Sequence, residues 1–296
     1  MIKLGDLVFA GLTNGSIYAI LALCVSVLFR VSGIINFAVG DFAMVGAMGA
    51  AFFVQNDGWN LALAIVVVLI FIGLFAYVFD LTVLRAAFES RRGYDKVTAT
   101  FFYTLALSFF IEGVAFHMFG TEVHAAPELW SGYTLTIAGL HIQRAGVIII
   151  GAAVVTGVGF AAFIQLSLVG KAVAACGENA FGARVVGIRQ GSYRRGTFVA
   201  MSVLAGLFGI MLSPVTGFVY NSGSDLGWTG VVAAAFAGFT RPGRAVLMGI
   251  AIGLAEAFIG GYISTEYQEA FLYLGLVLII LCYPGVLGAG NLVEVD

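Results

Sequence analysis

Apolar side chains fill eight long runs of this chain, and charged or turn-forming residues separate one run from the next. An α-helix needs about 20 residues to cross the ~30 Å hydrocarbon core of a bilayer. The pattern therefore predicts membrane-spanning helices over Leu7–Phe29, Ile34–Val54, Leu61–Phe79, Val97–Phe119, Ala145–Leu168, Gly196–Val219, Ala245–Ile263 and Ala270–Leu287. A further apolar stretch, Trp228–Phe239, is too short to span, so we expect a half-helix buried in protein.

Composition supports this interpretation. Apolar residues make up 61% of the 296 positions and charged residues only 10%, whereas soluble domains are about a quarter charged. This excludes a water-soluble enzyme and predicts one all-α polytopic membrane domain over residues 1–296. The net charge of −2 provides no basic field for nucleic acid. The three cysteines are scattered, so neither a zinc site nor a disulfide framework is indicated.

Basic residues between the expected spans are distributed asymmetrically. One side collects 12 of the 14 Lys and Arg residues, and the other has only Lys3 and Arg144. The positive-inside rule then places the N-terminus outside and the C-terminus in the cytoplasm, provided that the half-helix crosses with its neighbours. If the half-helix is instead re-entrant, everything after Asp225 is inverted. We favour the crossing version.

Two connections between spans are long enough to have structure of their own. The cytoplasmic one, Gly170–Arg195, carries five basic residues, and its alanines suit a short helix in the membrane interface. The alternative is a solvated basic loop that anchors to anionic lipid. The outer connection, Gly120–Gln143, is acidic and aromatic, which fits either a docking surface or an interfacial belt.

Catalytic motifs are not found in the sequence. Gly170-Lys171-Ala172 lacks the flanking glycine and Ser/Thr of a phosphate-binding loop, so we expect no ATP-hydrolysing site in this chain. The three histidines lie near or beyond the outer boundary and have no metal-binding spacing. We therefore predict no catalytic residue and no metal ligand.

Ionisable residues inside apolar runs are costly and are expected to face protein or water. The candidates are Asp41, Asp80, Glu112 and Glu256, and we interpret Asp80 as a boundary residue of its span. In the fourth span, polar residues recur at four-residue steps, at Thr100, Thr104, Ser108 and Glu112. This stripe fits one wall of a solute pathway. Equally, the hydroxyls could bond to their own helix while Glu112 snorkels to the surface.

Several ordered segments resemble a known family. Gly11-Leu-Thr-Asn-Gly-Ser-Ile-Tyr-Ala-Ile20 and Gly33-Ile-Ile-Asn-Phe-Ala-Val-Gly-Asp-Phe42 are similar to the permeases of branched-chain amino acid ABC importers, specifically the LivH-type subunit. Thr104–Ser108, the Gly170–Ile188 loop, Ala237–Phe239 and Tyr283–Gly288 agree in the same order. Val39 departs from the family, which usually has a histidine there. That departure leaves the solute open among branched-chain amino acids, urea, amides and other small carboxylates.

The resemblance implies ATP-driven import by alternating access in a bacterial inner membrane. Its implied partners are two cytoplasmic ATP-binding subunits that hold ATP and Mg, a second permease, a periplasmic binding protein and membrane lipid; this chain itself would bind no cofactor. The second permease could be a copy of this chain or, as the resemblance suggests, a LivM-like one.

The resemblance and the polar positions together assign two sets of residues. We expect Asn14, Asn36, Asp41, Thr104, Ser108, Glu112 and Glu256 along the substrate pathway, and Glu178, Asn179, Arg184 and Gly187 in the ATPase-coupling loop at about 170–195. An ion-coupled secondary transporter or channel, in which Asp41 or Glu256 couples to protons or sodium, is the main alternative. A non-transporting membrane scaffold is the third.

Overall fold

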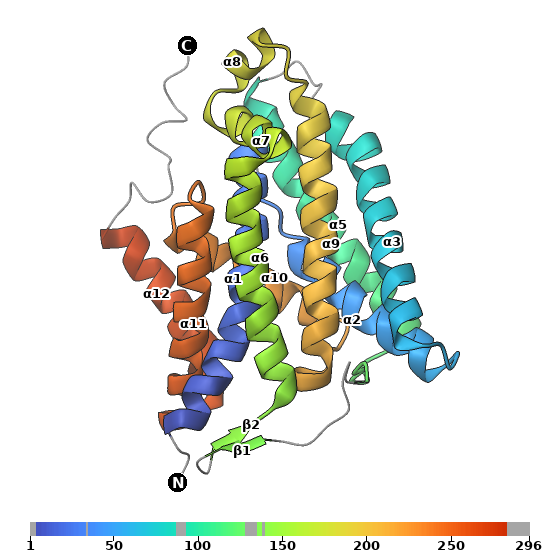
Figure 1. Ribbon diagram of the computed structural model, residues 1–296, viewed down its shortest axis with the longest axis vertical. Coiled ribbons are helices and arrows are strands. Elements are labelled where there is room, and N and C mark those ends of the chain that lie inside the picture. Colours follow the sequence, from blue (N-terminus) through green and yellow to red (C-terminus); the bar gives the residue numbers. More distant parts are fainter. Residues whose placement is uncertain (1–3, 34, 87–92, 128–134, 138–139, 283–296) are drawn as a thin grey trace.

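The protein is a bundle of tilted α-helices (Figure 1). A computed structural model describes residues 4–33, 35–86, 93–127, 135–137 and 140–282. Within these residues, six helices are long and apolar enough to cross a membrane, which agrees with the expected all-α polytopic fold. They are α1 (Leu4–Ser32), α3 (Leu61–Phe79) with the π-helical turn η1 (Asp80–Leu84) that continues it, α5 (Gly93–Phe119), α6 (Arg144–Leu166), α9 (Gln190–Thr216) and α11 (Pro242–Tyr262).

Shorter elements connect or flank these helices. The structure has α2 (Val39–Gln55), α7 (Leu168–Glu178), α8 (Ala180–Val185), α10 (Ser222–Phe236), the 3-10 turn η2 (Thr265–Tyr267) and α12 (Gln268–Cys282). Strands β1 (Leu135–Ile137) and β2 (Leu140–Ile142) form an antiparallel hairpin in which Leu135 lies opposite Ile142. The connection at about 170–195 is therefore helical, as expected, and the outer connection contains a hairpin.

Several expected boundaries differ from the structure. The second span was expected from Ile34, but α2 begins only at Val39, because residues 35–38 form a loop before the helix. The half-helix was expected at Trp228–Phe239, but α10 begins six residues earlier, at Ser222. The eighth expected span is described up to Cys282, and its last residues, 283–287, lie outside the described residues.

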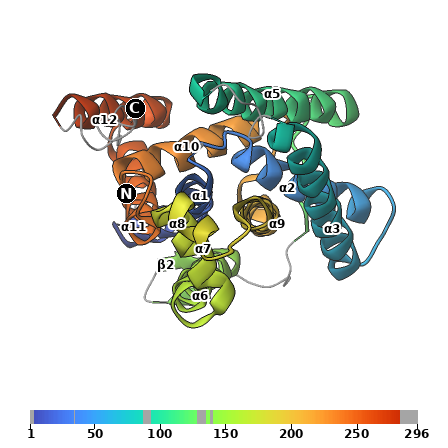
Figure 2. The same cartoon turned by 90° about the horizontal axis from the view of Figure 1, so that it is seen from above.

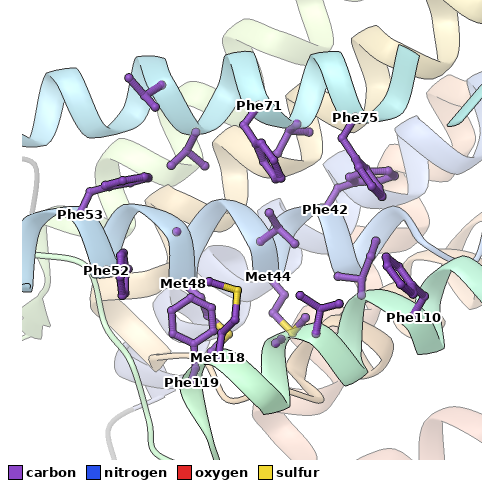
Figure 3. A pocket seen from close by; sticks show the side chains of 18 residues that line it. Phe42, Met44, Met48, Phe52, Phe53, Phe71, Phe75, Phe110, Met118 and Phe119 are labelled. Carbon is purple, nitrogen blue, oxygen red and sulfur yellow. The ribbon is translucent and has the colours of Figure 1, made fainter. Parts of the chain in front are cut away.

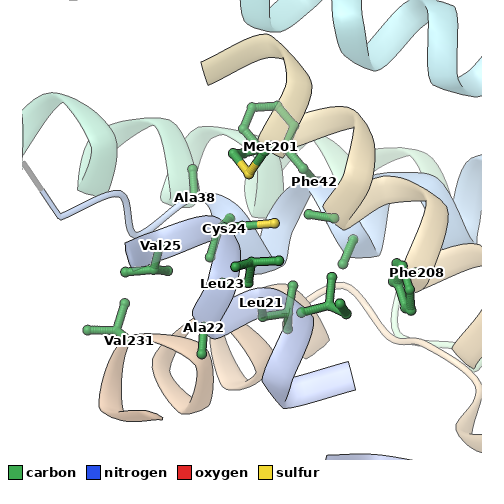
Figure 4. Close-up of a cluster of buried hydrophobic side chains, with 14 of the residues drawn as sticks. Leu21, Ala22, Leu23, Cys24, Val25, Ala38, Phe42, Met201, Phe208 and Val231 are labelled. Atoms are coloured by element: carbon green, nitrogen blue, oxygen red, sulfur yellow. The ribbon is translucent and has the colours of Figure 1, made fainter. Parts of the chain in front are cut away.

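Helix α1 lies at the centre of the bundle (Figure 2). Its residues from Ile17 to Leu28 are almost all buried, and they pack against α9, α10, α2 and α11. Figure 4 shows Leu21, Leu23 and Cys24 of α1 among Phe42 of α2 and Phe208 of α9. The apolar core is thus built around the first span.

The helix directions define two ends of the molecule. At the hairpin end, α1 begins and α9 ends, where His124 and Phe218 form a β-bridge. At the α7 end, Arg30 of α1 contacts Glu178 of α7, and the Ser26 hydroxyl donates to the Phe239 carbonyl just before α11. Helix α10 therefore leads from the hairpin end towards the α7 end, as the crossing alternative requires.

Candidate functional site

A short loop that contains the polar residue Asn36 precedes α2 in the middle of the bundle. The Asn36 side-chain oxygen accepts a hydrogen bond from the Ala38 backbone N–H at 3.1 Å, which fixes the turn before α2. The Thr104 hydroxyl of α5 is 3.3 Å from the Ile35 carbonyl and 3.0 Å from the Phe101 carbonyl of its own helix. The side chain of Thr104 therefore links α5 to the loop, while it also bonds back to its own helix.

The beginning of α10 packs against the beginning of α2 without intervening side chains. A Cβ atom on Gly227 would lie 2.9 Å from the Phe37 carbonyl oxygen, and one on Gly223 would lie 2.8 Å from the Asp41 Cα. A Cβ on Gly40 would meet the backbone of Gly223 and Gly227. Because only glycine allows backbones to approach this closely, the two helix starts form one junction.

Asp41 is enclosed in that junction. The residue is completely buried, and neither carboxylate oxygen has a hydrogen-bond partner among the described residues. Ser108 and Glu112 of α5 are the side chains that interact electrostatically with the Asp41 carboxylate. The Glu112 Oε1 atom is likewise buried without a partner among the described residues. We call Asp41, Ser108 and Glu112 the carboxyl site.

The carboxyl site has a definite chemical capacity. An isolated buried carboxylate is strongly disfavoured, and two carboxyl groups in one apolar site cannot both stay ionised without a cation. The arrangement is suited to hold a proton or a cationic group. Because Glu112 Oε1 is buried, Glu112 does not snorkel to the surface as the alternative interpretation of the stripe proposed. Thr100, Thr104 and Ser108 are buried as well, so the stripe faces protein.

Asp80 lies at the end of α3, where a boundary residue was expected, but its side chain does not face the surface. It is completely buried at the start of η1, where Arg194 donates to it through two nitrogens and the Arg195 Nε donates to it at 3.0 Å. These three residues carry a net charge of +1. Arg194 also lines a narrow pocket together with Asn36 and Thr104. The sequence held one signal of this pairing, since Asp80, Arg194 and Arg195 all lie at the cytoplasmic ends of their expected spans.

Two of the expected pathway residues belong to another part of the molecule. Asn14 is half-buried on α1, and Glu256 is half-buried on α11. These helices pack against each other along their length. The Glu256 backbone carbonyl accepts a hydrogen bond from the Gln268 side chain at 2.8 Å. The structure thus brings together Asn36, Asp41, Thr104, Ser108 and Glu112, and it places Asn14 and Glu256 on the α1–α11 pair.

The expected coupling residues lie on α7, α8 and the turn that follows. Glu178 is exposed and pairs with Arg30 at 2.7 Å, while the Asn179 side chain caps α8 by accepting from the Gly182 N–H at 2.7 Å. Arg184 is exposed on α8. Gly187 ends α8 with φ of +85°, a conformation that favours glycine.

A small apolar cluster fixes α7 and α8 to the bundle. Val173, Cys176 and Ala183 are buried together with Val31 of α1. Burial raises the pKa of the Cys176 thiol. The cluster therefore joins α7 and α8 to the end of α1 through apolar contacts.

A large cavity lies between α2, α3 and α5 (Figure 3). Its volume is about 440 Å³, and all of its lining side chains are apolar, with Phe42, Met48 and Phe110 among them. Such a cavity offers no hydrogen-bond partner to a polar solute. It suits an acyl chain or another apolar group.

Comparison with known proteins gives this geometry a context. Residues 7–281 match the family described as branched-chain amino acid transport system / permease component. The chain belongs to this family. The expected resemblance to LivH-type permeases is confirmed, and the family is one of transport permeases, not of enzymes.

Individual relatives extend over nearly the full length. The high-affinity branched-chain amino acid transport system permease protein LivH of Escherichia coli strain K12 is 28% identical over 295 residues, which cover 95% of this chain and 94% of the relative. LivH of Salmonella typhimurium gives the same figures. BraD of Pseudomonas aeruginosa is 26% identical over 290 residues, 94% of either chain. With its membrane-length helices, the protein is a multi-pass membrane permease.

Proposed function

We propose that this chain is the permease subunit of a binding-protein-dependent ABC importer in a bacterial inner membrane. It moves branched-chain amino acids or a related small solute into the cytoplasm, and two cytoplasmic partner subunits hydrolyse ATP for the work. The observation that carries the proposal is the match of residues 7–281 to permease components of branched-chain amino acid transport systems. A second permease and a periplasmic binding protein complete the assembly.

Two regions of the chain have separate roles in the proposed import. The carboxyl site and the polar groups beside it, Asn36 and Thr104, line the solute pathway. Helices α7 and α8 receive the movement of the ATPase subunits at the cytoplasmic side. The Arg30–Glu178 pair and the apolar cluster around Cys176 carry this movement to α1. The N-terminus then lies outside and the C-terminus in the cytoplasm.

A reconstitution experiment tests the function. The chain is purified with the ATPase subunits and second permease of its transport system, placed in liposomes and supplied with the binding protein and radiolabelled leucine. We expect uptake that depends on ATP and on the binding protein. A chain that carries solute alone, without ATPase subunits, contradicts the proposal.

Variants at Gly187 test the coupling role in the same liposomes. Gly187→Val places a β-branched residue at positive φ, which such residues rarely adopt, whereas Gly187→Asn can adopt it. We expect the valine variant to lower the number of solute molecules moved per ATP by about tenfold, because ATP hydrolysis continues while transport slows. The asparagine variant should stay close to the unmodified chain. Equal coupling in both variants would refute the role of this turn.

The carboxyl site also favours a second candidate, an ion-coupled transporter, because both Asp41 carboxylate oxygens and the Glu112 Oε1 atom are buried without partners among the described residues. The two candidates differ in their driving force. Uptake by liposomes that contain only this chain, with a proton or sodium gradient and no ATP, would support the ion-coupled candidate.

A further inference from the structure

The large cavity between α2, α3 and α5 opens sideways from the bundle. Figure 3 shows α2 lying between α3 and α5, so that α2 forms the floor of the cavity and the other two helices form its walls. On these walls, Phe71 of α3 and Phe110 and Met118 of α5 are exposed, each with 58–60% of its surface accessible. Both walls belong to segments that are long and apolar enough to cross a membrane. The opening therefore faces the hydrocarbon of the bilayer.

The lining of this cavity is unsuited to a polar occupant. Its floor consists of apolar side chains and glycine, among them Val45, Gly49 and Phe53. A buried water molecule needs at least two polar partners, and the side chains of this lining supply none. An empty cavity would leave the lining atoms without packing partners on one side, which costs stability. An apolar occupant restores these contacts.

The cavity has the length and width of a single hydrocarbon chain. On α5 its lining runs from Phe110 to Phe119, which is about 14 Å along the helix axis. One leaflet of the hydrocarbon core is about 15 Å thick, half of the full ~30 Å. The cavity volume of about 440 Å³ over this length gives a mean cross-section of about 30 Å². A helix about 10 Å across needs about 80 Å², whereas an extended acyl chain is only one methylene group wide. The shape therefore favours an acyl chain over a helix of another protein.

One end of the cavity lies at the level expected for lipid headgroups. There, Phe52 packs against Phe119 with ring centroids 5.8 Å apart, and Trp59 stacks on Phe53 at 4.8 Å. Tryptophan is enriched where the hydrocarbon core meets the headgroups. Neither adjoining segment, residues 52–64 or residues 115–127, contains Lys or Arg, so an anionic headgroup would find no cation there. We call this the Trp59 end of the cavity.

We propose that this cavity binds one acyl chain of a zwitterionic phospholipid. The headgroup lies at the Trp59 end, and the methyl end of the acyl chain reaches Phe42 and Phe110. Phe42 directly follows Asp41 in α2, so the bound lipid supports the helix that contributes Asp41 to the carboxyl site. The lipid site is defined by this chain alone. It therefore does not depend on the solute, the ATPase subunits or the orientation proposed above.

Photoreactive phosphatidylethanolamine tests the proposal on the unmodified full chain in liposomes. One probe carries a diazirine near the carboxyl end of an acyl chain, and a second probe carries it near the methyl end. After irradiation, mass spectrometry maps the adducts. We expect the first probe to label Phe53 and Phe119, and the second to label Val45 and Phe110. The exposed face of α6, which includes Val155, contacts bulk lipid and should be labelled by both probes.

Labelling of α6 without labelling of α2, or the two probes labelling α2 in the reverse order, would refute the proposal. A protein occupant is tested by replacing Phe71, at the cavity opening, with the photoreactive residue p-benzoylphenylalanine in native membranes. We expect this residue to form adducts with lipid. Adducts with a second copy of this chain or with any other protein would exclude the lipid. Failure of the proposed function is seen separately, as solute uptake without ATPase subunits, and it leaves the labelling pattern unchanged.

Ala115→Phe fills the cavity from α5 and provides a second test, since Ala115 is part of its lining. We expect labelling of α2 to fall about tenfold, because the loss of only two buried methylene contacts already changes occupancy by this factor. Ala161→Phe makes the same change at an exposed position of α6 and should leave the labelling of α2 unaltered.

Thermal unfolding gives a readout that does not need the photoreactive probes. A ligand that binds only the folded state raises the melting temperature. Adding phosphatidylethanolamine to delipidated protein in detergent should therefore raise the melting temperature of the unmodified chain and of Ala161→Phe, and should raise that of Ala115→Phe much less. Equal rises in all three proteins would refute the proposal. If Ala115→Phe does not fold, the order of labelling in the unmodified chain still decides the proposal.

Discussion

In two pairs of helices in this protein, glycines allow the backbones to approach closely. The two pairs differ in the side chains that they enclose. In the α1–α11 pair, a Cβ on Gly11 would lie 2.9 Å from the Leu254 Cα, and one on Gly15 would lie 2.9 Å from the Ile250 carbonyl oxygen. In the α2–α10 junction, Gly40 and Gly223 allow an equally close approach. Both contacts bring backbone against backbone.

The two contacts differ in the polar groups that lie near them, and this difference separates their roles. Among the described residues, the buried side-chain oxygens without a hydrogen-bond partner belong to Asp41 and Glu112, and neither lies on α1 or α11. Unsatisfied buried groups reduce stability, and proteins keep them mainly where function requires them. The α1–α11 pair is therefore a scaffold. The α2–α10 junction encloses the Asp41 carboxylate, which has no hydrogen-bond partner among the described residues.

Among the substitutions considered, Asp41→Asn should have the largest effect. It should lower transport without lowering stability. Asparagine has the same shape but no charge, so burying it costs less than burying a carboxylate. We expect the melting temperature of the purified complex to stay unchanged or rise, while ATP-driven uptake falls at least about tenfold, or about 1.4 kcal/mol. Uptake in liposomes and thermal unfolding in detergent measure the two quantities.

A matched substitution controls this test. Asp57→Asn removes a carboxylate from an exposed turn and should change neither uptake nor melting temperature. If Asp41→Asn instead lowered the melting temperature and left uptake per folded complex intact, the carboxylate would be part of the scaffold. The contrast between the two helix pairs would then disappear.

Gly253→Ala should have the reverse effect, a loss of stability. The added methyl group would meet the Gly15 backbone and lie 2.7 Å from the Gly11 carbonyl oxygen. Overpacking of this kind costs about 1–3 kcal/mol. We expect a lower melting temperature and a lower yield of folded protein, with normal uptake per folded complex.

Gly151→Ala is the control for Gly253→Ala because it makes the same chemical change in α6. A Cβ on Gly151 meets nothing within 4 Å. Alanine is the better helix former, so this variant should be neutral or slightly stabilising. Equal melting temperatures for the two variants would show that the α1–α11 contact is not tightly packed.

The sequence predicted the long apolar spans better than the α2–α10 junction. Span Leu61–Phe79 agrees with α3 residue for residue, because a long apolar run bounded by polar residues has few alternatives. The start of α2 could not be predicted, since residues 35–38 are mostly apolar and their loop depends on Asn36 and Thr104.

The tertiary partners of the site residues could not be predicted from the sequence either. Asp80 reads as a boundary residue by hydropathy, and its partner Arg194 is 114 positions away in the sequence. The half-helix was expected to begin at Trp228, whereas α10 also includes Ser222–Gly227, whose glycines pack against α2. The polar residue types indicated Asp41, Ser108 and Glu112 as candidates. Only the fold shows that Asp41 of α2 lies near Ser108 and Glu112 of α5.

Gly223→Ala should have the smallest effect of the three substitutions. It tests whether α10 shifts at the junction during transport. Its methyl group would press on the Asp41 side chain and lie 2.8 Å from the Asp41 Cα. If the junction opens during transport, α10 can shift to accommodate the group, so the melting temperature should fall less than in Gly253→Ala. Uptake should fall, though by less than in Asp41→Asn.

The double variant Gly223→Ala with Asp41→Asn decides whether both residues act in one step. Residues that share a site give non-additive effects, whereas independent residues add. We therefore expect uptake by the double variant to equal that of Asp41→Asn alone. Additive losses would mean that Gly223 serves only the packing of α10, and the junction would then resemble the α1–α11 scaffold in all but its carboxylates.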